Sequence, residues 1–120
     1  MTVATGSPSI EVRASPVHGR GVYATRSVPA GEVVVEAHAL LLEPDDTDAL
    51  AGHLLASYLV AWDEHRTAVP FGPLSFVNHD DEPNAELVVD HDRTLVLLVT
   101  TARVAAGSEV TVDYGEDHPI

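Results

Sequence analysis

Short apolar segments, some alternating with polar residues and some uninterrupted, predict a chain built mainly from β-strands. Alternation over residues 10–14 (IEVRA) is typical of a strand with one buried face, and the apolar run over residues 95–101 is typical of a fully buried strand. Gly- and Pro-containing turns separate such segments. The expected strands are residues 10–14, 22–24, 33–35, 38–42, 86–89, 95–101 and 109–113. A small β-rich fold follows.

One segment has helical spacing instead. Its apolar residues recur three or four positions apart: Leu50, Leu54, Leu55, Tyr58, Leu59 and Trp62. This spacing predicts one main helix over about residues 48–63, with Thr47 or Asp48 as its N-cap. The apolar stripe is expected to pack on the sheets, which makes Tyr58 and Trp62 core residues first.

Two turns share a sequence pattern. Residues 28–33 read VPAGEV and residues 104–110 read VAAGSEV. In each, a glycine that tolerates positive φ (Gly31 or Gly107) closes a tight turn, and a strand follows. We interpret this echo as turn chemistry used twice, not as a repeat architecture.

The composition fits one small domain over residues 1–120. Hydrophobic residues make up 45% of the chain, which is enough for a core, but a domain of this size is only modestly stable. A homodimer that covers further apolar surface is therefore one expectation. Cysteine is absent, which excludes disulfides and thiolate zinc sites in this sequence. With no leader-like start and no apolar run of about 20 residues, the expected location is cytoplasmic and not in a membrane.

The formal net charge of −13 limits the partners of the chain. Direct binding to nucleic acid is not expected, because phosphate contacts need clustered cations. An acidic surface keeps a protein soluble, and it also attracts basic partners.

Three segments carry candidate chemistry, and each has a plain structural alternative. Gly19-Arg20-Gly21 is a turn by itself, although small residues also permit close approach of the backbone to a ligand. Residues 78–84 read NHDDEPN, and the Asn78 amide offers both donors and an acceptor to a polar ligand. His79 is more often a hydrogen-bonded structural histidine than a catalyst.

The third segment, residues 107–115, ends in Tyr114 and Gly115. Tyr114 ends the alternating strand at residues 109–113, where it could pack on the sheet edge or present its hydroxyl to a site from a rigid strand. A metal site is not expected, because the acidic and histidine positions match no ligand spacing; these are His79, Asp80, Asp81, His91 and Asp92.

In this order, the three segments resemble the signature of SET-domain protein-lysine methyltransferases. That family runs G-x-G, then N-H-S/C-x-x-P-N, then G-E-E-(L/I)-T-x-(D/S)-Y. This chain has GRG at residues 19–21, NHDDEPN at 78–84 and GSEVTVDY at 107–114, with Asp80 and Ser108 departing from the pattern. The resemblance spans roughly residues 10–117 and is greatest to short bacterial and viral members without zinc-binding flanking modules.

The resemblance implies a fold and a cofactor. The family fold has several small curved sheets and a C-terminal pseudoknot, with Asn78, His79 and Tyr114 at the crossing. S-adenosylmethionine would bind on one face of the crossing, and the substrate lysine of a basic protein would enter a channel from the other.

The resemblance also implies roles for individual residues. Tyr114 would be catalytic, orienting the amine and the methyl group. The cofactor would contact the amide of Asn78, the backbone of His79 and the backbone of Gly19, Arg20, Gly21 and Val22. Tyr23, Tyr58 and Tyr114 would line the substrate channel.

An alternative function belongs to a different class. Only five residues follow Gly115, and aromatic residues make up 5% of the chain, whereas family members continue with an aromatic-rich tail. A SET-like module with weak or no catalysis that binds a basic protein partner would also fit the sequence.

Overall fold

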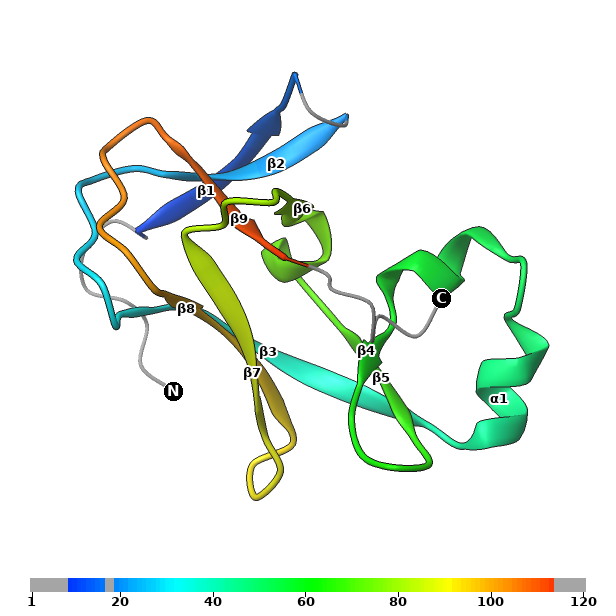
Figure 1. Cartoon of the computed structure of the whole chain (residues 1–120). Coiled ribbons are helices and arrows are strands. Elements are labelled where there is room, and N and C mark those ends of the chain that lie inside the picture. The colour runs from blue at the N-terminus through cyan, green and yellow to red at the C-terminus, as the bar shows by residue number, and fades with distance from the viewer. Residues whose placement is uncertain (1–8, 17–18, 114–120) are drawn as a thin grey trace.

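Two curved sheets, in which most neighbouring strands are antiparallel, form the body of the molecule (Figure 1). The computed structural model describes residues 9–16 and 19–113. One sheet has the strand order β1 (Ile10–Ala14), β2 (Arg20–Ala24), β9 (Glu109–Val112) and β6 (Asn78–His79). The other has the order β4 (Val60–Ala61), β5 (Thr67–Pro70), β3 (Val33–Leu42), β8 (Leu95–Thr100) and β7 (Ala85–Asp90). The prediction of a mainly β chain with several small sheets is confirmed.

The strands predicted from alternation are confirmed, with two differences. The segments expected at residues 33–35 and 38–42 form one long strand, β3, with a register irregularity between Val33 and Val35. The sequence did not predict β4, β5 and β6, which have only two, four and two residues. Strands that short carry almost no period-2 signal.

The prediction of a single helix over residues 48–63 is wrong. The structure has a short helix α1 (Pro44–Ala49) and then a 3₁₀ turn η1 (Leu54–Tyr58), with β4 following directly. Pro44 occupies the first turn of α1, where its fixed φ favours a helix start, so the N-cap is Glu43 and not Thr47 or Asp48. Between the two elements Gly52 has a φ of +78°, a conformation that ends helical geometry.

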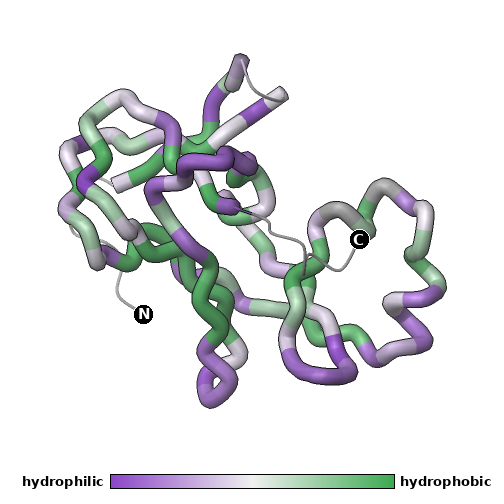
Figure 2. Tube along the Cα trace, viewed as in Figure 1, coloured by the Kyte–Doolittle hydropathy of each residue, from purple (hydrophilic) through white to green (hydrophobic). Residues whose placement is uncertain are grey.

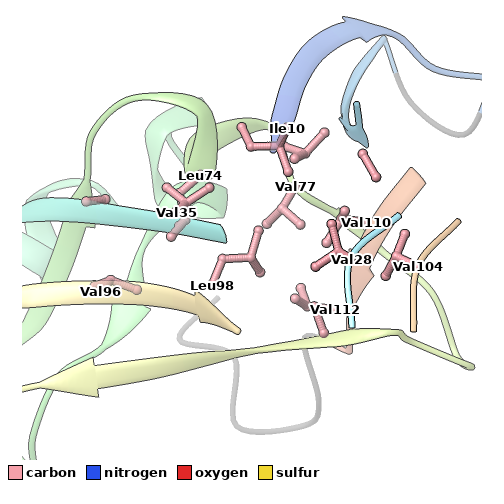
Figure 3. Close-up of a cluster of buried hydrophobic side chains, with 14 of the residues drawn as sticks. Ile10, Val28, Val35, Leu74, Val77, Val96, Leu98, Val104, Val110 and Val112 are labelled. Atoms are coloured by element: carbon pink, nitrogen blue, oxygen red, sulfur yellow. The ribbon is translucent and has the colours of Figure 1, made fainter. Parts of the chain in front are cut away.

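A second 3₁₀ turn, η2 (Pro73–Phe76), packs between the sheets and contributes the buried Leu74 to the core. Valines dominate this core, and Figure 3 shows side chains from both sheets meeting there. Trp62 is buried, as predicted, whereas Tyr58 is half-buried. Hydrophobic residues lie along the strands, and the loop between β7 and β8 is mainly hydrophilic (Figure 2).

The two turns with the shared sequence pattern lie side by side. Val28 and Val104 pair in an antiparallel bridge, with two backbone hydrogen bonds of 2.8 Å between them. Both valines are buried, and Gly31 and Gly107 each have a φ of +85°. The pairing holds the turn before β3 against the turn before β9, and it therefore connects the two sheets.

The C-terminal strand β9 runs between β2 and β6. It pairs antiparallel with β2 and parallel with β6, so Asn78 lies beside Thr111. The Asn84 amide fixes this arrangement: its Nδ2 donates to the Glu109 carbonyl at 2.9 Å, and its Oδ1 accepts from the Thr111 N–H at 2.9 Å. The segments expected to cross in the pseudoknot are thus in direct contact.

Two exposed turns are closed by aspartates. The backbone N–H groups of His65 and Arg66 donate to Asp63, together with the Arg66 side chain, and they lower the pKa of Asp63 to about 2. This stabilisation is present at neutral pH and is lost as the pH falls from the ordinary carboxyl range through about 2. At the β7–β8 hairpin, the Arg93 side chain lowers the pKa of Asp90 and is itself raised in pKa.

A buried hydroxyl offers a test of how the first turn is held. Thr100 is 1% exposed; its Oγ1 donates to the Pro29 carbonyl at 2.6 Å and accepts from the Glu32 N–H at 3.0 Å. We expect Thr100→Val to lower the free energy of unfolding by about 1–3 kcal/mol, because the Pro29 carbonyl and the Glu32 N–H lose their partly buried hydrogen bonds to the hydroxyl. Chemical denaturation measures this. The exposed neighbour Thr101→Val is the control, and equal effects of both substitutions would contradict the prediction.

Candidate functional site

The three motif segments come together on the sheet that contains β9. Because β9 is flanked by β2 and β6, the sheet brings residues from the start, the middle and the end of the chain to one place. Gly21, Asn78 and Glu109 meet there. The convergence of segments that the sequence could only align by motif is therefore observed in the structure.

The Glu109 carboxylate lies at the centre of this cluster. It accepts from Asn78 Nδ2 at 2.7 Å, from Ser15 Oγ at 3.0 and 3.2 Å, and from the Tyr23 hydroxyl at 3.3 Å. Glu109 is half-buried, so these bonds are only partly screened by water. Hereafter Glu109, Asn78, Ser15, Tyr23 and Gly21 are called the Glu109 cluster.

The Asn78 side chain is buried, with 6% of its surface exposed. Its Nδ2 donates to the Arg20 carbonyl at 2.9 Å and to Glu109 at 2.7 Å, which uses both amide hydrogens. No described donor contacts Oδ1. Because no described side-chain nitrogen or oxygen is both fully buried and unpaired, Oδ1 reaches solvent. Asn78 thus presents one open acceptor from an otherwise saturated amide.

The glycines of the first motif have different reasons for being glycine. Gly21 is buried, and a Cβ at this position would collide with Glu109 Oε2 and lie 3.1 Å from Asn78 Nδ2. Gly19 has open space around it but a φ of +50°. The sequence left a plain turn and close approach of a ligand open for both; the structure shows that Gly21 makes room for the protein's own carboxylate and amide.

The neighbouring residues of that motif contribute through the backbone. Arg20 is exposed, and its carbonyl accepts from Asn78. Val22 is fully buried in the core, so only its backbone could contact a ligand.

His79 is held by two carboxylates. Its Nε2 lies 2.9 Å from Asp81 Oδ1, and its Nδ1 lies 3.5 Å from Asp113 Oδ1. Asp81 lies in the loop after β6, and Asp113 directly follows β9, the parallel neighbour of β6. They favour the structural interpretation of the ring and leave the His79 backbone as the part expected to contact a cofactor.

The three tyrosines expected in a substrate channel have separate positions. Tyr23 belongs to the Glu109 cluster, and the Arg13 guanidinium lies 4.3 Å from its ring centroid. Tyr58 ends η1 beside β4 of the other sheet and makes no hydrogen bond to the described cluster. Tyr114 lies outside the described residues. The structure therefore brings Tyr23 to the site and does not connect Tyr58 to it.

Sequence reasoning missed the roles of Ser15 and Glu109. A serine or a glutamate in a sequence does not indicate which distant residue it contacts, and these two are 94 positions apart. A signal was present nonetheless: Glu109 is a charged residue at the start of the strand EVTV, whose other three residues are buried, and it lies opposite Tyr23 in the β2–β9 register.

The described residues contain neither a metal-binding cluster nor a helix that could span a membrane. Within residues 9–16 and 19–113, no three His, Asp or Glu side chains are grouped closely enough to hold a metal ion. No helix in the same part of the chain is long and apolar enough to cross a membrane.

Comparison with known proteins places this geometry in a family. Residues 19–115 match the SET domain. The chain is 29% identical over 119 residues to human histone-lysine N-methyltransferase 2B, covering 92% of this chain and 4% of that protein. It is 30% identical over 111 residues to the trithorax histone-lysine N-methyltransferase of Drosophila virilis, covering 83% of this chain and 3% of that protein. The chain thus spans only a small part of these two relatives.

A shorter relative and a solved structure match over more of their own length. The Schizosaccharomyces pombe histone-lysine N-methyltransferase specific for H3 lysine-37 is 24% identical over 108 residues, covering 89% of this chain and 74% of that protein. The crystal structure of a candidate histone methyltransferase from Plasmodium falciparum has a TM-score of 0.74 at 17% identity, covering 92% of this chain and 96% of that one. At this identity the structural likeness shows the fold alone. With a family match over residues 19–115 and the shared fold, the chain belongs to the SET-domain family.

Proposed function

We propose that this chain is a protein-lysine N-methyltransferase that transfers a methyl group from S-adenosylmethionine to a lysine amine of a basic protein. The observation that carries the proposal is the open acceptor of Asn78, held where the three family motifs converge. The sequence relatives, which are named as histone-lysine N-methyltransferases, support the reaction class.

The residues present fit the cofactor. S-adenosylmethionine carries an α-ammonium group, and Asn78 Oδ1 is an acceptor suited to such a donor. The backbone of residues 19–22 and of His79 borders the same place, because β2 and β6 both flank β9. When bound, the cofactor supplies an electrophilic methyl group on a sulfonium.

The protein must then present a neutral amine in line with that methyl group. Transfer would form a bond from the lysine nitrogen to the methyl carbon and would leave the electron pair of the broken C–S bond on sulfur. Free lysine has a pKa of about 10.4, and both a desolvating channel and a nearby cation would lower it. The proton leaves to water, so alignment is the main task of the protein, and it can supply on the order of 7 kcal/mol or more. We assign the orientation of the amine to the Tyr114 hydroxyl.

The charge of the chain supports a basic substrate. The net charge is −13, and acidic residues are exposed on several elements, including Asp80, Asp81 and Glu82 in the loop after β6. Such a surface attracts lysine-rich segments and speeds their encounter.

The proposal is tested by methyl transfer from labelled S-adenosylmethionine to histones and other lysine-rich proteins. The chain contains no lysine, so label on the protein itself does not report lysine automethylation. Transfer to lysine supports the proposal. Calorimetric binding of S-adenosylhomocysteine without transfer to any of these proteins would instead favour a SET-like module that binds a basic partner, and absence of both would contradict the proposal.

Removal of one hydroxyl tests the role of Tyr114. We expect Tyr114→Phe to lower kcat by about a hundredfold, because orientation of the amine and methyl group is lost while the aromatic ring is kept. The affinity for S-adenosylhomocysteine, measured by calorimetry, should stay within about twofold of the unsubstituted chain. Full activity of Tyr114→Phe would remove this hydroxyl from the mechanism.

A pair of glycine substitutions separates available space from backbone conformation. Gly21→Ala places a methyl group against Glu109 and Asn78, so we expect the affinity for S-adenosylhomocysteine to fall about tenfold or more. Gly19→Ala, in open space at a φ of +50°, should cost about 1 kcal/mol of stability and change binding little. Thermal melts and calorimetry measure both, and equal losses of affinity in the two variants would be inconsistent with this account.

A further inference from the structure

The Asn78 amide connects an anion to an open acceptor. Its Nδ2 points at Glu109 and at the Arg20 carbonyl, at 2.7 and 2.9 Å. A carboxylate and a carbonyl can only accept, so the amide must present its NH₂ group to them and its Oδ1 to the opposite side. The hydrogen-bond partners of Asn78 therefore fix which side of its amide carries the nitrogen and which carries the oxygen.

The Glu109 carboxylate is itself fixed from three directions. Ser15 comes from the end of β1, Tyr23 from β2 and Asn78 from β6, and each donates to it. Gly21 leaves the space that the carboxylate occupies. The backbone hydrogen bonds between β2 and β9 already hold these two strands together. The side-chain hydrogen bonds to the half-buried Glu109 carboxylate are therefore not needed for strand pairing.

We propose that Glu109 is a positioning residue of the cofactor pocket, which orients and polarises the Asn78 amide so that Oδ1 favours a cationic donor. This inference rests on the proposed function, in which the donor is the α-ammonium of the cofactor. Glu109 does not touch the cofactor; it acts through Asn78.

The physical basis is a chain of two hydrogen bonds with unlike charges at its ends. A carboxylate that accepts from Nδ2 draws positive charge to that end of the amide and leaves Oδ1 a stronger acceptor. The short 2.7 Å bond between Asn78 and Glu109 is typical of a charge-assisted contact. Because both side chains are at least half-buried, the negative charge also acts on the ammonium with reduced screening.

Glu109→Gln isolates this charge. Glutamine keeps the size of the side chain and an oxygen for Asn78, and the hydroxyls of Ser15 and Tyr23 can rotate to accept from its NH₂ group. The variant thus retains the packing of the cluster and removes its charge. The matched control is Glu86→Gln, an exposed position on β7.

The experiment compares two ligands by calorimetry. One is S-adenosylhomocysteine, and the other is the same molecule with its α-amino group replaced by hydrogen. We expect Glu109→Gln to weaken binding of S-adenosylhomocysteine about tenfold and binding of the deaminated ligand by less than about twofold. Glu86→Gln should change neither. A purely structural role of Glu109 would weaken both ligands equally, and this outcome would overturn the inference.

The outcomes distinguish this inference from the function on which it rests. If the unsubstituted chain does not bind S-adenosylhomocysteine, both proposals fail. If it binds, and the ratio of the two affinities is the same with Glu109 and with Gln at this position, only the role of Glu109 is overturned.

A measurement on the unsubstituted chain covers the case in which Glu109→Gln does not melt cooperatively. The side-chain amide signals of Asn78 in ¹⁵N NMR report its hydrogen bonds directly. We expect them to move on addition of S-adenosylhomocysteine and to move much less with the deaminated ligand. Equal movement with both ligands, or none with either once bound, would contradict the inference.

Discussion

The insertion of β9 between β2 and β6 is the constraint on which the rest of the molecule depends. β9 pairs with β2 on one side and with β6 on the other, and the Asn84 amide makes two hydrogen bonds to its backbone. Without it, β6 would have no partner in the described sheet, and the Asn78 amide and the Tyr23 hydroxyl would lose the Glu109 carboxylate as their acceptor. Fold and site are therefore stabilised by the same contact.

The sequence predicted well wherever structure is decided locally. Alternating and continuous apolar runs identified β1, β3, β7, β8 and β9, because the side-chain period of a strand is visible within five or six residues. The helix prediction was wrong for a local reason that the apolar spacing does not show. Pro44 starts the helix before residue 48, and Gly52 interrupts it. The two-residue strand β4 exists only through its pairing with β5, which no sequence window contains.

The site was predictable as a set of segments and not as a set of contacts. The motif order gave Gly21 and Asn78, and both lie where three strands meet. The role of Glu109 was hidden, because its partners are 31, 86 and 94 residues away in the sequence. Gly21 shows the same limit: a glycine required by a neighbouring side chain and a glycine required by a ligand look identical in a sequence.

The long sequence separations within the site have a consequence for the order in which the protein can be built. A ribosome releases residues 10–24 well before residue 109, so the first hairpin must wait for the end of the chain before Ser15 and Tyr23 meet their acceptor. Contacts of such high sequence separation are slow to form, since most of the chain must be ordered to close the loop between them. We therefore expect the Glu109 cluster to form late in folding: a chain without β9 contains every strand of the sheet β4-β5-β3-β8-β7 but lacks the strand that joins β2 to β6.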